Sequence, residues 1–185
     1  MELLLWRYTT ENMKKDEFFA KHWKPQTGKY HWTGWDIVRR VEGKRVIDIG
    51  CGNNQFKGYI PDLVGLDPYT EESDIKIPIE HFTSQKKWEV ALCFGSINFD
   101  GRKLVESQIQ RVSDILTEAG EIYWRQNPGR YDHRTMAERG WDYEFEMFEW
   151  SHQMNFELAK QFGFEVLQVE PDNDRLYAHW RKIKK

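Results

Sequence analysis

The feature that most constrains the fold is a short apolar run closed by an acid and two glycines, at residues 45–54, RVIDIGCGNN. A short run of β-forming residues bounded by turn residues predicts a buried strand. Glycines directly after a strand let the backbone approach a ligand closely, because no Cβ stands in the way. A helix that follows such a loop would add free N–H groups and positive potential. The stretch therefore predicts a ligand-binding loop of the nucleotide type.

Apolar runs and amphipathic segments alternate along the rest of the chain. Further strands are predicted at residues 62–68, 88–97, 120–126, 164–170 and 175–182. Helices are predicted at residues 11–22, 34–42, 102–118 and 151–161, the last one starting at Ser151. This alternation predicts an α/β fold with a mostly parallel sheet covered on both faces. The last two strands, joined by a short turn, are expected to be antiparallel to each other.

Composition narrows the class of protein. A chain of 185 residues predicts a single domain, residues 1–185, with an N-terminal helical or lid segment at 1–44 and a sheet core at 45–182. The formal net charge of -3 gives no global basic field for nucleic acid. No stretch approaches ~18 apolar residues, so no membrane span is expected. Cys51 and Cys93 are expected to be reduced thiols that hold no metal, which suits a cytoplasmic location.

Two positions decide which ligand the glycine loop suits. The Gly-x-Gly-x-x-Gly pattern of dinucleotide sites requires a third glycine where this chain has Gln55. Asp67 ends the second apolar run, where an acid can accept hydrogen bonds from two ribose hydroxyls. Asp48, before the first glycine, is expected to orient the glycine loop through the loop's backbone N–H groups. A nicotinamide oxidoreductase is therefore the weaker alternative.

Residues 48–54, DIGCGNN, resemble motif I of class I S-adenosylmethionine-dependent methyltransferases, whose pattern is acid-x-Gly-x-Gly-x-Gly. Asn54 stands at the last glycine, and asparagine tolerates positive φ well, so a positive φ is expected there. Residues 65–68, GLDP, resemble the family's second motif, and residues 161–166 resemble a junction common in its small-molecule members.

The resemblance covers roughly residues 35–182 and implies a Rossmann-like three-layer sandwich. Its sheet would have seven strands, mostly parallel, in the order 3-2-1-4-5-7-6, with strand 7 antiparallel. The chain departs from the family between Asp67 and Trp88, where the family usually fits a helix, a third strand and another helix. The fold is therefore expected to be shortened between strands 2 and 4, with the adenine side shallow or closed by other residues.

The resemblance also implies a site for S-adenosylmethionine. The residues assigned to that cofactor are Asp48, Gly50, Gly52, Asn53, Asn54, Asp67, Pro68, Asp74, Ile75, Gly95 and Ser96. Among them, Asp74 and Ile75 would lie near the adenine, while Ser96, together with Asn98, would border the reacting methyl group.

Two further residues are candidates for catalysis. Asn98 follows a predicted strand and would either orient the acceptor or cap the next helix. His133, in a polar loop, would serve as a general base or be a solvated surface residue. Residues 141–150 mix acids and aromatics, which suits either a packed helix or a lid that favours a cationic acceptor.

The expected activity is methyl transfer to an unidentified acceptor, most simply a small molecule. The alternative is an inactive module of the same fold that binds the cofactor or a partner. A nucleic-acid methyltransferase is less favoured, although residues 21–35 interleave bases and aromatics that can stack on nucleic acid. The sequence leaves the oligomeric state open.

Overall fold

The computed structural model describes residues 15–22, 34–128, 148–172 and 175–184. Within these ranges six strands form one sheet in the order β2-β1-β3-β4-β6-β5. The strands are β1 (Val46–Ile49), β2 (Leu63–Leu66), β3 (Trp88–Phe94), β4 (Leu116–Gln126), β5 (Phe164–Asp172) and β6 (Arg175–Lys182). The β1–β2, β1–β3 and β3–β4 pairs are parallel, and β6 is antiparallel to both of its neighbours. The expected mostly parallel sheet with an antiparallel strand is confirmed.

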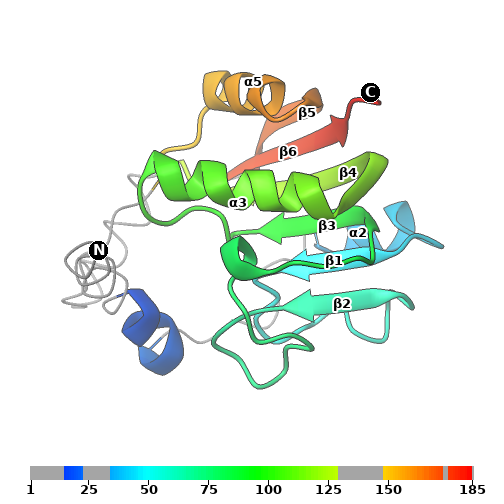
Figure 1. Ribbon diagram of the computed structural model, residues 1–185, viewed down its shortest axis with the longest axis vertical. Helices are drawn as coiled ribbons and strands as arrows, with labels where there is room; N and C mark the ends of the chain where they lie inside the picture. Colours follow the sequence, from blue (N-terminus) through cyan, green and yellow to red (C-terminus); the bar gives the residue numbers. More distant parts are fainter. Residues whose placement is uncertain (1–14, 23–33, 129–147, 173–174, 185) are drawn as a thin grey trace.

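Helices cover both faces of this sheet (Figure 1). Helices α3 (Arg102–Ile115) and α5 (His152–Gln161) lie on one face, and α2 (Gly34–Arg40) lies on the other. Because successive strand residues point to opposite faces, β1 serves both layers. Ile47 packs in the cluster that contains Val105 of α3. Val46 packs in the cluster that contains Ile37 of α2. The three-layer sandwich is therefore confirmed.

The structure corrects the expected strand count. The third strand of the family's sheet is reduced to a single parallel bridge between Leu66 and Ile75. The Ile75 N–H donates to the Gly65 carbonyl, and the Ile75 carbonyl accepts from the Asp67 N–H, both at 3.1 Å. Before β3 the chain makes one 3-10 turn, η2 (Ile79–His81). Residues 68–87 are too few for a helix, a strand and another helix, so the sheet formed by the described residues has six strands where seven were expected.

The segment after the glycine loop is also reduced. Residues 51–62, all of them described, form successive turns and no helix. The Asn54 N–H donates to the Cys51 carbonyl, and the Lys57 N–H donates to the Asn54 carbonyl, each at 2.9 Å. Phe56 and Ile60 are buried and pack on the α2 side of the sheet. The turns therefore supply the apolar layer that a helix would supply, without a helix N-terminus at the loop.

Side chains cap the outer edge of β2, where the third strand would have paired. The Gly65 N–H donates to the Asp74 carboxylate at 2.8 Å. The Lys57 ammonium donates to the Leu63 carbonyl at 3.1 Å and to the same Asp74 carboxylate at 2.7 Å. Unpaired strand edges are templates for association with other chains. Asp74 and Lys57 therefore close an edge that the shortened chain leaves without a strand.

Other elements follow the sequence closely. The Ser151 hydroxyl accepts from the Met154 N–H at 3.1 Å and so caps α5, as expected from the sequence. Helix α3 ends at Ile115, earlier than expected, because β4 begins at Leu116. The π-helix η1 (Phe18–His22) lies within the first predicted helix. Across the described ranges, no helix has the length and apolar character needed to cross a membrane.

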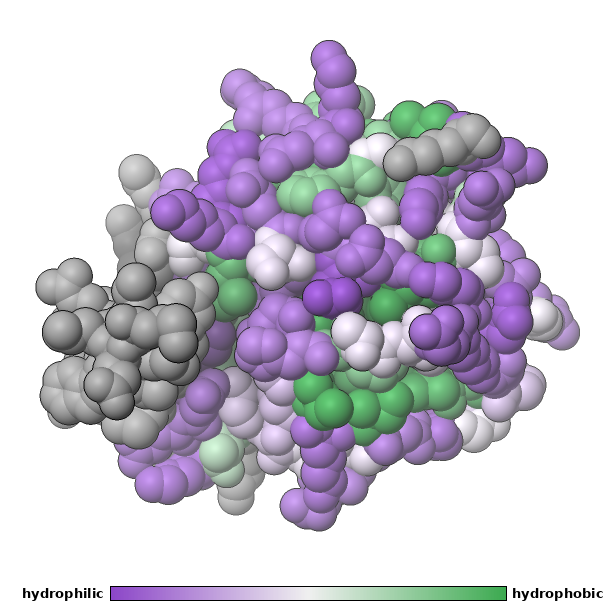
Figure 2. Space-filling model, in the orientation of Figure 1, coloured by the Kyte–Doolittle hydropathy of each residue, from purple (hydrophilic) through white to green (hydrophobic). Residues whose placement is uncertain are grey.

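The surface of the face shown in Figure 2 is mostly hydrophilic. Hydrophobic residues gather below α3 in that view, over β1 and β2. The covering layer there contains η2 and no longer helix. Val64 and Ile75 are only partly buried against the core, and Ile77 is exposed. The shortened segment at residues 68–87 therefore also leaves only a thin layer of residues over β2.

Candidate functional site

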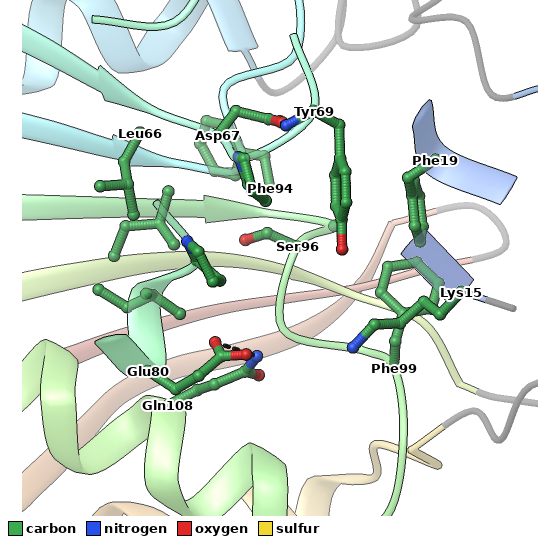
Figure 3. Close-up of a pocket in the computed structure, with 16 residues that line it drawn as sticks. Lys15, Phe19, Leu66, Asp67, Tyr69, Glu80, Phe94, Ser96, Phe99 and Gln108 are labelled. Carbon is green, nitrogen blue, oxygen red and sulfur yellow. Dashed lines mark hydrogen bonds between the residues drawn. The ribbon is translucent and has the colours of Figure 1, made fainter. Parts of the chain in front are cut away.

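A cavity opens at the carboxyl ends of β1, β2 and β3 (Figure 3). In an open α/β sheet, this is the edge at which ligands bind. The lining includes five of the residues that sequence reasoning assigned to a cofactor: Gly50, Asp67, Pro68, Gly95 and Ser96. Four segments far apart along the chain complete the walls, namely the N-terminal turn, η2, α3 and the loop after β3.

The glycine loop and the loop after β3 touch at Gly50 and Ser96. A Cβ placed on Gly50 would lie 2.3 Å from the Ser96 Cβ, and Gly50 has a φ of +70°. Only glycine satisfies both conditions. The Ser96 Oγ is buried and has no hydrogen-bond partner among the described residues. Figure 3 shows this hydroxyl beside the cavity. A buried polar atom without a partner is costly, so Ser96 is ready to bond with a ligand there.

Asp67 links the glycine loop to the end of β2. Its carboxylate accepts from the Gly52 N–H at 3.1 Å and from the Tyr69 N–H at 2.8 Å. Burial raises the pKa of Asp67, while the backbone N–H groups of Tyr69, Gly52 and Thr70 act to lower it. A carboxylate has about four acceptor positions. These backbone donors therefore leave acceptor capacity for a hydroxyl group in the cavity.

Asp48 lies on the β1 face opposite to Ile47 and Ile49 and does not line the cavity. Its side chain is buried, at 3% exposure. Burial, together with the charge of Asp67, raises the pKa of Asp48 to about 7. No hydrogen bond joins its carboxyl to another described residue. The bonds to loop N–H groups that were expected of Asp48 are made by Asp67 instead.

Asn54 has a φ of +53°, so the expected positive φ is confirmed. Its side chain packs over Gly65, where a Cβ would lie 2.6 Å from the Asn54 Oδ1. It also donates to the Glu72 carbonyl at 2.9 Å. Asn53 and Asn54, like Gly52, lie outside the cavity lining. Asn54 thus holds the loop against β2 and the segment that follows it.

Asp74 and Ile75 do not line the cavity either. Asp74 caps the outer edge of β2, as described above, and Ile75 forms the single bridge to Leu66. The compression of residues 68–87 draws both residues onto that edge. Ile79 and Glu80 of η2 line the cavity, and the expected place of Asp74 and Ile75 near the adenine stays a prediction.

Sequence reasoning missed two polar residues in the cavity, Glu80 and Gln108. The Gln108 Nε2 donates to the Glu80 Oε2 at 3.1 Å. The Gln108 Oε1 is buried and has no partner among the described residues. A signal for Gln108 was present, because it is a polar residue between Leu104 and Val112 on the apolar face of its helix. Glu80 carries no such signal, since its segment has no periodic pattern.

Residues near the N-terminus form one end of the cavity (Figure 3). The Phe19 ring stacks on Tyr69 with centroids 5.5 Å apart, and it meets Phe99 edge-on at 4.9 Å. The Tyr69 hydroxyl donates to Asp16, and the Lys15 ammonium pairs with Asp100. These contacts hold residues 15–22 against the loops after β2 and β3. The broader expectation of a lid over residues 1–44 stays a prediction.

Asn98, one of the two catalytic candidates, lies outside the cavity lining. Asn98 is buried, and its Oδ1 accepts from the Asn127 N–H at 2.9 Å. Its carbonyl accepts from the Phe148 N–H at 2.9 Å. Asn98 therefore joins the loops after β3 and β4, and α3 is capped by Gly101 instead. His133 lies outside the described residues, as do residues 23–33 and 141–147. Among the residues that are described, no cluster of three His, Cys, Asp or Glu side chains is placed to hold a metal ion.

Comparison with known proteins identifies the fold. No family model matches the chain, and no curated protein sequence matches it. Solved structures do match. N-methyltransferase NodS from Bradyrhizobium japonicum, in complex with S-adenosylhomocysteine, has a TM-score of 0.67 at 10% identity, covering 93% of this chain and 98% of that one.

Two more structures with bound S-adenosylhomocysteine agree. Burkholderia thailandensis 1,6-didemethyltoxoflavin-N1-methyltransferase has a TM-score of 0.62 at 15% identity, covering 96% of this chain and 90% of that one. Magnesium protoporphyrin IX methyltransferase from Synechocystis has a TM-score of 0.65 at 9% identity, covering 94% of each chain. The chain therefore has the Rossmann-like fold of class I S-adenosylmethionine-dependent methyltransferases.

Proposed function

We propose that the protein binds S-adenosylmethionine in this cavity and transfers its methyl group to a small-molecule acceptor. One observation carries the proposal: Gly50, Asp67 and Ser96, from the ends of three neighbouring strands, line the same cavity. The residues present fit the cofactor. A glycine that no other residue can replace sits beside a buried hydroxyl without a partner, and a carboxylate with remaining acceptor capacity sits on the adjacent strand.

Each side chain has a separate task in this proposal. The Asp67 carboxylate accepts hydrogen bonds from the ribose hydroxyls. Gly50, Gly95 and Ser96 border the amino acid end and the methyl group. When bound, the cofactor supplies a methyl group on a sulfonium, which is already activated for attack by a nucleophile. The protein's contribution is then mainly to hold the acceptor in line with that methyl group.

Aromatic residues at the N-terminal end of the cavity serve the same chemistry. Phe19, Tyr69 and Phe99 form a contacting group there. Their rings exclude water from the cavity, and their faces attract positive charge, such as that of a sulfonium. Their placement in the wall supports a site for a cationic cofactor.

Two observations favour a small molecule as the acceptor. The structures with the same fold include methyltransferases that act on 1,6-didemethyltoxoflavin and on magnesium protoporphyrin IX, both small molecules. The formal net charge of -3 gives this chain no overall attraction for nucleic acid.

A second candidate function is cofactor binding without catalysis, as a module that acts on a partner. The reduced scaffold favours it: the third strand is a single bridge, and turns replace the helix after the glycine loop. Both functions predict binding of S-adenosylmethionine, so transfer must be measured to separate them.

The test is transfer of a labelled methyl group from S-adenosylmethionine into an extract separated into metabolite, nucleic-acid and protein fractions. We expect label in the metabolite fraction, strongly reduced in Asp67→Ala. Asp62→Ala is the matched control, because Asp62 is exposed and pairs with Lys86 away from the cavity. Binding without incorporation into any fraction would favour the second function. Incorporation into nucleic acid or protein alone would contradict a small-molecule acceptor.

A further inference from the structure

We propose that Tyr69, backed by Asp16, receives the proton that the acceptor's nucleophile loses on methylation. The acceptor is then a compound whose nucleophilic atom carries an N–H or O–H group. This inference rests on the proposed function and assigns the acceptor end of the same cavity. It names one catalytic residue, Tyr69, and one residue that acts through it, Asp16.

The cavity has an end that the proposed cofactor contacts leave open. Asp67 holds the ribose and Ser96 borders the methyl group in the proposed function. The wall beyond them comes from the N-terminal turn and from the loops after β2 and β3, with the lining residues Lys15, Phe19, Tyr69 and Phe99. Figure 3 shows the Tyr69 hydroxyl directed away from Asp67 and into this end of the cavity. An acceptor that lies there faces the methyl group and the Tyr69 oxygen together.

The direction of the hydrogen bond at Tyr69 decides what its oxygen can do. The Tyr69 hydroxyl donates to the Asp16 carboxylate. Because a hydroxyl has one proton and two lone pairs, the Tyr69 oxygen is left to accept a hydrogen bond from a ligand. Burial, and next the hydrogen bond to Asp16, raise the pKa of Tyr69, so the group is a neutral phenol. A neutral phenol can take up a proton only if it passes its own proton on.

Asp16 gives that proton a route out of the cavity. Tyr69 is half-buried, whereas Asp16 is exposed on the N-terminal turn. During transfer, the nucleophile forms a bond to the methyl carbon as the sulfur–methyl bond breaks, and the bonding electrons stay on sulfur. The positive charge that develops on the nucleophile makes its own proton acidic. This proton passes to the Tyr69 oxygen as the Tyr69 proton passes to Asp16, which exchanges it with water.

Other polar groups at this end of the cavity lack one of these two properties. The Lys15 ammonium pairs with Asp100 and can only donate hydrogen bonds. The Ser96 hydroxyl is buried and has no hydrogen-bond partner among the described residues, so it has no group to which it could pass a proton. The two phenylalanine rings carry no polar atom. In the described part of this wall, Tyr69 is therefore the side chain that can both accept the proton and pass it on.

The experiment measures transfer of labelled methyl groups from saturating S-adenosylmethionine into the metabolite fraction of the extract. Binding of S-adenosylhomocysteine is measured in parallel by calorimetry. The variants are Tyr69→Phe, Asp16→Asn and Asp16→Glu. Tyr69→Phe keeps the ring and the backbone N–H that Asp67 accepts, and Asp16 is exposed, so these variants are expected to fold.

Three further variants serve as controls. Tyr59→Phe makes the same chemical change at a tyrosine that is 60% exposed and lies outside the cavity lining. Glu17→Gln removes the carboxylate next to Asp16, which pairs with Lys21. Asp100→Asn breaks the other polar contact that holds the N-terminal turn, and so reports the effect of loosening that turn alone.

Tyr69→Phe should lower transfer by about 100-fold or more, while its affinity for S-adenosylhomocysteine stays close to that of wild type. Asp16→Asn should also lower transfer, and Asp16→Glu should restore part of the loss because it keeps a carboxylate. Tyr59→Phe and Glu17→Gln should transfer as wild type does.

A second readout is independent of transfer. In protein that carries ¹³C at the tyrosine Cζ, the Tyr69 resonance is the one that Tyr69→Phe removes. Loss of the carboxylate partner should shift this resonance in Asp16→Asn, whereas Glu17→Gln should leave it in place.

Wild-type transfer by Tyr69→Phe, or an unmoved Tyr69 resonance in Asp16→Asn, would overturn the assignment and leave the proposed function in place. Equal losses of transfer in Tyr69→Phe and Asp100→Asn would also overturn it, because they would show that the hydroxyl only holds the N-terminal turn. Wild-type protein that transfers no label would overturn the proposed function, and the inference with it.

Discussion

The Asp67 carboxylate accepts a hydrogen bond from the Gly52 N–H at 3.1 Å, which ties the loop after β1 to the end of β2. The same carboxylate accepts from the Tyr69 N–H and lines the cavity. One buried acid therefore shapes the glycine loop and faces the ligand. Stability and binding are consequently linked at this residue.

Replacing Asp67 should affect both properties. Asp67→Ala removes a charged acceptor, so binding of S-adenosylhomocysteine should weaken by roughly 1.5–3 kcal/mol. The variant also leaves the Gly52 and Tyr69 N–H groups without their partner, so the free energy of unfolding should fall by about 1–3 kcal/mol. Calorimetric titration and urea unfolding measure the two effects. Unchanged affinity in folded Asp67→Ala would show that the ribose does not bind there.

Asp48 should make stability depend on pH. Its pKa is raised in the folded protein from 3.8 to about 7. Between about pH 4 and pH 7 the unfolded chain releases this proton while the folded protein keeps it, so the free energy of unfolding falls as pH rises. Asp48→Asn should flatten this slope and stabilise the protein at pH 8 by on the order of 2 kcal/mol. Urea unfolding of both proteins from pH 4 to 8 measures it, and parallel curves would contradict the assignment.

Two glycines with similar backbone conformations allow the cost of backbone strain to be measured separately from the cost of a close contact. Gly43 and Gly50 have φ values of +73° and +70°, but a Cβ on Gly43 would meet nothing within 4 Å. Gly43→Ala should therefore cost only the conformational strain, about 1–2 kcal/mol. Gly50→Ala should cost an additional ~1–3 kcal/mol, because its Cβ would press on Ser96. Equal losses of stability in the two variants, measured by thermal unfolding, would mean that the glycine loop does not touch the loop after β3 at Gly50.

The edge role of Asp74 is testable against the adenine role that sequence resemblance suggested. Asp74→Ala removes the acceptor of the Gly65 N–H and the partner of Lys57. We expect concentration-dependent self-association, visible by light scattering, because the outer edge of β2 becomes exposed. Binding of S-adenosylhomocysteine should stay as in wild type. Weakened binding without self-association would favour the adenine role of Asp74.

The sequence predicted the parts of the fold that local patterns encode. Residue types and near neighbours determine three such features. They are the strand before Gly50, the helix cap at Ser151 and the positive φ at Asn54. Asp67 could be singled out for the same reason, because it ends a recognisable strand, and it lines the cavity.

The remaining features depend on contacts between distant segments. Glu80 reaches Gln108 only because η2 packs on α3, and Phe19 reaches Tyr69 from the N-terminal turn. Asp74 bonds to the edge of β2, which the shortened chain leaves with a single bridge, while its expected place near the adenine stays a prediction. Such outcomes follow from packing, which a single sequence does not reveal.

The most direct test of the central claim is a calorimetric titration of the wild-type protein with S-adenosylhomocysteine and, separately, with NAD. We predict saturable binding of one S-adenosylhomocysteine per chain, competed by S-adenosylmethionine, and no binding of NAD. Binding of NAD, or the absence of binding by both S-adenosyl ligands to the folded protein, would contradict the account.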